Sequence, residues 1–168
     1  MLECGPKRGT AMLKRKAYDR LLAWKANPDR RALLIDGARQ VGKTFLVREF
    51  AREHYPVFVE INFTETPEAK AIFDGNLDAS TLIPLISAFA GTALAPGETL
   101  VFLDEIQECA RARTAIKFLV DDGRFDFIES GSLLGVNYED VPSLPVGYET
   151  EFRMFPLDFE EFLWANGM

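Results

Sequence analysis

Eight consecutive residues have the types and the spacing of a phosphate-binding loop. The segment Gly37-Ala38-Arg39-Gln40-Val41-Gly42-Lys43-Thr44 matches G-x-x-x-x-G-K-[ST] in full, between a short apolar run and an amphipathic stretch. Glycines let such a loop curl so that its backbone N–H groups point at one anion, and the following helix adds its positive end. We therefore predict that residues 37–44 cradle a nucleoside triphosphate. Lys43 would reach the β- and γ-phosphates, and the Thr44 hydroxyl would coordinate Mg²⁺.

Two acidic residues follow another apolar run, at residues 100–103. Asp104 and Glu105 end this predicted strand, and the carboxyl ends of parallel strands face the ligand crevice. Such a strand ending is common by itself, but the complete phosphate-binding loop earlier in the chain favours a functional role for the two acids. We predict that Asp104 binds Mg²⁺ and that Glu105 orients or deprotonates the attacking water.

Other polar residues offer further candidates. Ser130 ends the predicted strand 125–130 and could act as a sensor of the γ-phosphate, although a strand-terminating turn explains it nearly as well. Gln107 could reach the water or cap the next turn. Tyr18 and Trp24 could border an adenine, but their positions on an apolar helix stripe favour the core. Three arginines are conceivable arginine fingers, and the sequence selects none of them: Arg111, Arg113 and Arg153.

The elements that must position these residues alternate between strands and helices. Segments that fit strands of such a sheet lie at residues 32–36, 57–63, 99–104 and 125–130, with a fifth candidate at 149–155. Helix-like patterns occupy residues 13–27, 44–54, 67–73, 80–91 and 113–121, and a last helix begins after an Asp158 cap. This alternation predicts an α/β fold whose parallel sheet is covered on both faces.

Composition and charge narrow the classes of function. The 168 residues, 48% hydrophobic, can bury one substantial core. The net charge is −7, and the acids lie mainly beyond residue 31, where 23 Asp/Glu face 10 Lys/Arg. An acidic body disfavours nucleic acid binding, and the basic start of the chain fits a solvated helix face.

The termini and cysteines point to a cytoplasmic protein. Cys4 and Cys109, with His54 as the single histidine, form no metal motif and are expected to be free thiols. The sequence has no secretory leader and no apolar run long enough to span a bilayer, so no membrane partner is expected. We expect residues 1–12 to be a flexible leader and residues 13–168 to be the core, with a C-terminal partner domain absent from this chain.

Five segments resemble, in order and spacing, a prokaryotic family of AAA-type P-loop ATPases: GARQVGKT after LLID, then VEINF, LVFLDEIQE, ESGSLLG and FRMFPLDFEEFL. The resemblance implies a three-layer α/β/α sandwich of the additional-strand, catalytic-Glu type, with a mainly parallel five-stranded sheet in the order 5-1-4-3-2. It also implies binding of ATP and Mg²⁺, with functional residues carried over at the matching positions Gly37, Gly42, Lys43, Thr44, Asp104 and Glu105. Relatives often have a basic residue where this chain has Tyr148, so no role for a cation is carried over to that position.

Mg²⁺-dependent ATP hydrolysis coupled to a conformational change is the first function that these residues predict, with Lys43 and Glu105 in catalytic roles. The alternative is a nucleotide-dependent switch or interaction module that binds ATP or ADP with little turnover, because it needs the same cradle. A small-molecule kinase is less favoured, since an acid pair suits water activation, and no Asn-Lys-x-Asp segment indicates guanine recognition. An unknown protein or the missing domain is the expected partner, and oligomerisation stays open.

Overall fold

Five parallel strands form the centre of the molecule, seen in a computed structural model that describes residues 14–132 and 146–167. The strands are β1 (Ala32–Asp36), β2 (Val57–Asn62), β3 (Thr99–Asp104), β4 (Asp126–Gly131) and β5 (Glu149–Arg153). They pair in the order β2-β3-β4-β1-β5, and every pair is parallel. This is the predicted order 5-1-4-3-2 read from the opposite edge, so the predicted topology is confirmed.

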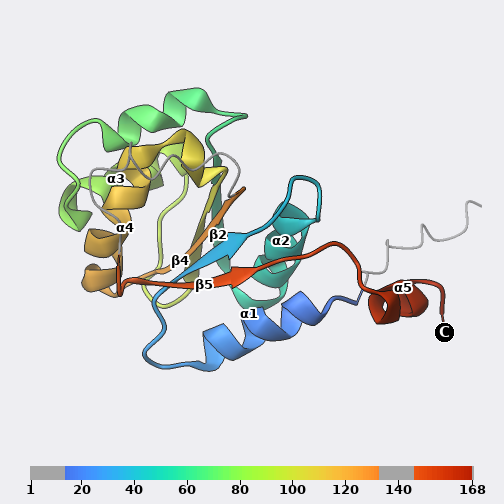
Figure 1. The fold of residues 1–168 in the computed structure, drawn as a ribbon. Coiled ribbons are helices and arrows are strands. Elements are labelled where there is room, and N and C mark those ends of the chain that lie inside the picture. The colour runs from blue at the N-terminus through green and yellow to red at the C-terminus, as the bar shows by residue number, and fades with distance from the viewer. Residues whose placement is uncertain (1–13, 133–145, 168) are drawn as a thin grey trace, which may run out of the picture.

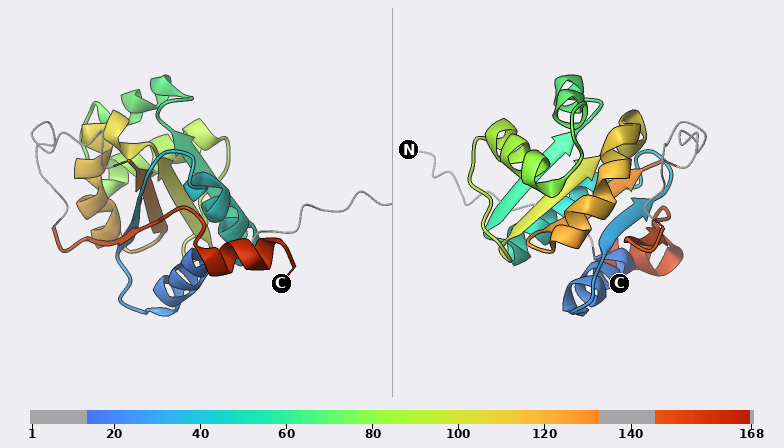
Figure 2. Two further views of the ribbon diagram at one scale, coloured as in Figure 1. Left: turned by 45° about the vertical axis from the view of Figure 1, so that its right-hand side comes forward. Right: turned by 90° about the vertical axis from the view of Figure 1, so that its left-hand side faces the viewer.

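Helices cover both faces of this sheet (Figures 1 and 2). One face carries α1 (Lys16–Ala26) and α2 (Lys43–His54). The other carries α3 (Ala79–Ala90) and α4 (Ala110–Asp122). Short 3₁₀ helices, η1 (Pro67–Phe73) and η2 (Ile106–Glu108), follow β2 and β3. The last helix, α5 (Phe159–Ala165), lies beside the start of α1. The predicted three-layer sandwich is confirmed.

Alternation of side chains along the strands divides the core in two. Leu33, Ile35 and Phe102 point toward α1 and α2, whereas Leu34 and Leu103 point toward α3 and α4. Successive strand residues face opposite sides, so a strand covered on both faces must be apolar throughout. The central strands β1 and β3 are indeed buried at every position, while the edge strand β5 is largely exposed.

Helix α1 packs on α2 through the aromatic residues of its stripe. Trp24 is buried, its indole N–H donates to the Arg31 carbonyl at 2.7 Å, and its ring lies against Phe50. Tyr18 meets Phe50 edge-on, with ring centroids 5.8 Å apart. Their placement agrees with the favoured core positions, because neither residue lines the loop.

The observed boundaries differ from the predicted ones by a few residues. Helix α4 begins at Ala110 rather than at residue 113, and β4 is shifted by one residue. The helix-like segment at residues 67–73 is a 3₁₀ helix with the predicted bounds. The expected leader at residues 1–12, including Cys4, lies outside the described residues, and Cys109 is a buried free thiol. None of the helices described is long and apolar enough to cross a membrane.

Candidate functional site

The loop between β1 and α2 requires glycine at both of its ends. A Cβ on Gly37 would lie 2.3 Å from the carbonyl oxygen of Met154, at the end of β5, so only glycine fits there. Gly42 has a φ of 94° directly before α2, in the left-handed region that favours glycine. Gln40 also has a positive φ, 64°. These conformations curl residues 37–42 over the amino end of α2.

The curl leaves a row of backbone donors without partners. From Ala38 to Thr44, no backbone amide donates a hydrogen bond to another described residue; the first amide to do so is that of Leu46, to the Gly42 carbonyl at 3.0 Å. The first amides of a helix have no partner inside the helix, and its dipole is positive at this end. The loop therefore presents several unpaired N–H groups that suit an anion.

Lys43 places a cation inside the curl. Its side chain is buried, and its Nζ donates to the carbonyl oxygens of Gly37 at 2.7 Å and Ala38 at 2.9 Å. Burial lowers the pKa of Lys43, while the nearby carboxylates of Glu105 and Asp104 oppose that shift. The loop and these acids thus position the ammonium beside the unpaired amides.

Asp104 is the centre of the polar cluster at the carboxyl end of the sheet. It is 1% exposed, and both of its carboxylate oxygens accept two hydrogen bonds. Oδ2 accepts from Thr44 Oγ1 at 2.7 Å and from Asn62 Nδ2 at 3.1 Å. Oδ1 accepts from the Ser130 hydroxyl and from the Glu105 amide, the latter at 3.1 Å. A buried carboxylate with four donors is held in one orientation.

This cluster brings together residues from four elements, and the sequence analysis had singled out three of these residues. Thr44 begins α2, Asp104 ends β3, and Ser130 lies near the end of β4. Asn62 was missed. It ends β2 and is aligned with Asp104 across the β2–β3 pair, so the polar end of its strand was a signal that sequence reasoning could have used.

Glu105 follows in a backbone conformation that a non-glycine residue rarely adopts. Its φ is 55°, and its carboxylate accepts a hydrogen bond from Gln107 Nε2. Left-handed non-glycine residues are costly and gather at functional sites. Gln107 does not cap α4, since no side chain of the described residues caps that helix. Its other amide atom, Oε1, is buried, has no hydrogen-bond partner within residues 14–132 and 146–167, and packs on Gly131, where a Cβ would lie 2.8 Å away.

The three candidate arginines take different roles in the fold. Arg111 donates to the carbonyl oxygens of Phe73 and Gly75, which ties α4 to the loop after η1. Arg113 is buried and paired with a glutamate of β5. Only Arg153 lies next to the loop, where its Nε donates to Asp36 Oδ2 at 2.9 Å.

The donors at this site fit a hard cation that is shared with a ligand. Within residues 14–132 and 146–167, no group of three or more His, Cys, Asp or Glu residues could hold a metal by itself. Thr44 Oγ1 and the Asp104 carboxylate supply two oxygen ligands on one side of the cluster. Mg²⁺ is characteristically held by one or two protein oxygens together with phosphate oxygens and water, so the pair fits Mg²⁺.

Comparison with known proteins agrees with this geometry. Residues 29–163 match a protein family described as AAA domain, a range that includes the loop and all the residues of the Asp104 cluster. No curated protein gives a significant match. The chain therefore belongs to the AAA domain family and carries a nucleotide-binding, ATPase-like domain.

Proposed function

We propose that this chain binds ATP together with Mg²⁺ and hydrolyses the β–γ phosphoanhydride bond, with the cycle coupled to a conformational change. The observation that carries the proposal is the 2.7 Å hydrogen bond between Thr44 Oγ1 and Asp104 Oδ2. It joins the end of the loop to the carboxyl end of β3, where the chemistry requires oxygen ligands.

The phosphates would lie along the loop. The unpaired amides from Ala38 to Thr44 suit a chain of anionic oxygens, and the Lys43 ammonium is positioned to neutralise the β- and γ-phosphates. The Thr44 hydroxyl and the Asp104 carboxylate would hold Mg²⁺. The ion, when bound, would neutralise charge that develops on the phosphate oxygens.

Glu105 is the residue that we assign to the attacking water. It lies one residue beyond the proposed metal ligand and is partly exposed, so its carboxylate can reach solvent. A carboxylate that accepts a proton from water, or orients that water, acts as a general base. Ser130 would act as the sensor, because its hydroxyl already contacts Asp104 and so links β4 to the state of the metal site.

The alternative, a nucleotide-dependent switch with little turnover, is supported by Gln107. Its amide donates to the Glu105 carboxylate and would compete with a water molecule for it. Steady-state phosphate release by the wild type and by Gln107→Ala distinguishes the two functions. Little phosphate release by the wild type that rises in Gln107→Ala would favour the switch, and sustained release by the wild type would favour the ATPase.

The proposed site is tested by titrating ATP, with and without Mg²⁺, into the wild type and Lys43→Ala. Removing a cation that is paired with phosphate is expected to weaken ATP binding about 100-fold. Lys117→Ala is the matched control, because Lys117 is on α4, on the other side of the sheet. Unchanged binding by Lys43→Ala would refute the site.

A further inference from the structure

A cavity lies against the outer side of the phosphate-binding loop. Its volume is about 640 Å³, and its lining is mainly apolar, including Val41, Phe45, Leu46, Met154 and Leu157. Small-molecule sites commonly have volumes of roughly 300–1,000 Å³ and an apolar lining with few polar groups. The cavity therefore has the size and character of a site for the base and sugar of a nucleotide whose phosphates occupy the loop.

One wall of this cavity comes from far along the chain. We call residues 154–158, between β5 and α5, the strap. The strap begins at Met154, which is buried and whose amide donates to the Asp36 carbonyl at 2.6 Å. Beyond Met154 the strap lies between the cavity and a second hollow of about 610 Å³ that α1 also lines. With hollows on both sides, the strap has little side-chain packing to hold it in place.

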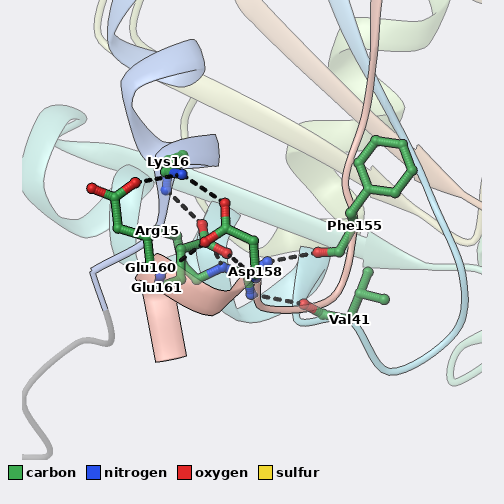
Figure 3. A network of polar contacts seen from close by, with 7 residues as sticks. All are labelled: Arg15, Lys16, Val41, Phe155, Asp158, Glu160 and Glu161. Atoms are coloured by element: carbon green, nitrogen blue, oxygen red, sulfur yellow. Dashed lines mark hydrogen bonds and ion pairs between the residues drawn. The ribbon is translucent and has the colours of Figure 1, made fainter. Parts of the chain in front are cut away.

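Arg15 supplies the missing support. Its Nη1 donates to the Val41 carbonyl of the loop at 3.1 Å, and its Nη2 donates to the Phe155 carbonyl of the strap at 2.7 Å (Figure 3). Its Nε donates to Glu161 Oε1 on α5 at 3.3 Å. The side chain is 12% exposed, so water competes weakly for these contacts. A planar guanidinium can make three such contacts in fixed directions, whereas an ammonium cannot.

The position of Arg15 is itself fixed by α5. Glu161 is buried, and its Oε1 also accepts the Lys16 amide at 2.8 Å. Asp158 and Glu161 form a capping box at the start of α5, which orients the Glu161 carboxylate. Lys16 adds ion pairs to Asp158 and Glu160, but these groups are about half exposed and contribute little.

We infer that Arg15 is a positioning residue that ties the strap to the loop and so holds the cavity in the shape that receives the nucleoside of ATP. The inference rests on the proposed function, since the phosphates must occupy the loop. Because binding energies are reciprocal, a nucleoside in the cavity also stabilises the docked strap and α5. The nucleotide would then control the position of the C-terminal segment through its base and sugar, independently of hydrolysis.

Binding of ATP and of inorganic tripolyphosphate to the same variants tests this inference. Tripolyphosphate fills the loop but leaves the cavity unused, so the ratio of the two dissociation constants measures the nucleoside contribution. The wild type is expected to prefer ATP, and Arg15→Ala is expected to reduce that preference at least about 10-fold, the effect of losing one charged hydrogen bond. Arg15→Lys keeps the charge and the fold but loses the bridging geometry, so it should reduce the preference as well.

Arg20→Ala is the control, because Arg20 is exposed on α1, which begins directly after Arg15, and makes no hydrogen bond or ion pair with a described residue. Hydrogen exchange at residues 155–165 gives a second readout: ATP should protect these amides more than tripolyphosphate does. Three results would overturn the inference. They are equal affinities of the wild type for ATP and tripolyphosphate, an equal loss of affinity for both ligands in Arg15→Ala and Arg15→Lys, or equal protection of these amides by the two ligands. If neither ligand binds the wild type, the proposed function fails, and the inference fails with it.

Discussion

Two neighbouring residues of β4, Glu129 and Ser130, point to opposite faces of the sheet and differ in their hydrogen bonding. Both are fully buried. The Ser130 hydroxyl donates to Asp104, whose two carboxylate oxygens both have partners. Neither carboxylate oxygen of Glu129 has a hydrogen-bond partner in the part of the chain that the structure describes. One face of β4 therefore carries an organised polar cluster, and the other carries a buried acid that is poorly satisfied.

The nearest charges do not satisfy Glu129. Arg113 Nη2 donates to Glu149 Oε1 at 2.7 Å, and both Arg113 Nε and Glu149 Oε2 lack partners among the described residues. Burial, and to a smaller extent the nearby Glu149 carboxylate, raise the pKa of Glu129 to about 8, although Arg113 opposes the shift. Glu129 is thus protonated at neutral pH. The polar groups on the loop face hold the Asp104 carboxylate in one orientation, whereas on the opposite face the buried Glu129 carboxyl finds no hydrogen-bond partner among the described residues, which costs stability.

Glu105→Gln, on the same side as the Asp104 cluster, should have the largest effect, and it should change turnover without changing stability. Gln cannot accept a proton from water, so turnover should fall by about two to four orders of magnitude. ATP affinity and the urea midpoint of unfolding should stay at their wild-type values. Phosphate release measures the effect, and Glu108→Gln, in the same turn and exposed, is the control. Hydrolysis at the wild-type rate would remove Glu105 from the mechanism.

Arg113→Met should affect only stability. It leaves the partly buried Glu149 and the buried Glu129 without a cation, and breaking a buried ion pair from one side costs about 3–5 kcal/mol. Urea denaturation should show this loss in the free energy of unfolding, with ATP affinity retained by the folded variant. Arg20→Met serves as the exposed control. A variant that is as stable as the wild type would mean that the pair contributes nothing.

Glu129→Gln should change how stability depends on pH. The folded protein holds a proton on Glu129 up to about pH 8, whereas the unfolded chain releases it near 4.5. Since the folded state binds the extra proton, this group makes the free energy of unfolding fall as pH rises between these values, by at most about 1.4 kcal/mol per unit. Urea denaturation across this range should show a flatter dependence in the variant. Parallel curves would contradict a protonated Glu129.

Ser130→Ala should have the smallest effect. Asp104 keeps its hydrogen bonds from Thr44, Asn62 and the Glu105 amide, so the metal site should persist. A loss of about 10-fold in turnover, or ~1.4 kcal/mol, is expected from one hydrogen bond. Ser132→Ala tests whether the neighbouring hydroxyl is the one that matters. A larger loss in Ser132→Ala than in Ser130→Ala would reverse the assignment.

Much of the fold and of the candidate site could be predicted because both are encoded locally. Apolar runs and amphipathic stretches predicted five strands and their covering helices, and the resemblance to a family supplied the strand order. The loop and the Asp104-Glu105 pair are contiguous motifs, so their positions at strand ends followed from the pattern. Asn62 was within reach of the same reasoning, because it also ends a strand of the sheet.

The contacts of Arg15 and Glu129 could not be predicted. Arg15 meets Glu161 across 146 positions of sequence, and no local spacing specifies that meeting. Glu129 is paired with Leu34 and Leu103 on the adjacent strands, and only the assembled sheet shows that Arg113 donates to Glu149 rather than to Glu129.

The sequence by itself determined which segments are buried and which backbone loop can hold an anion, because periodicity and glycine spacing act over a few neighbouring residues. Tertiary structure alone decided which polar groups find partners. That outcome depends on how distant elements pack, and it separates the ordered carboxylate of Asp104 from that of Glu129, which has no hydrogen-bond partner among the described residues.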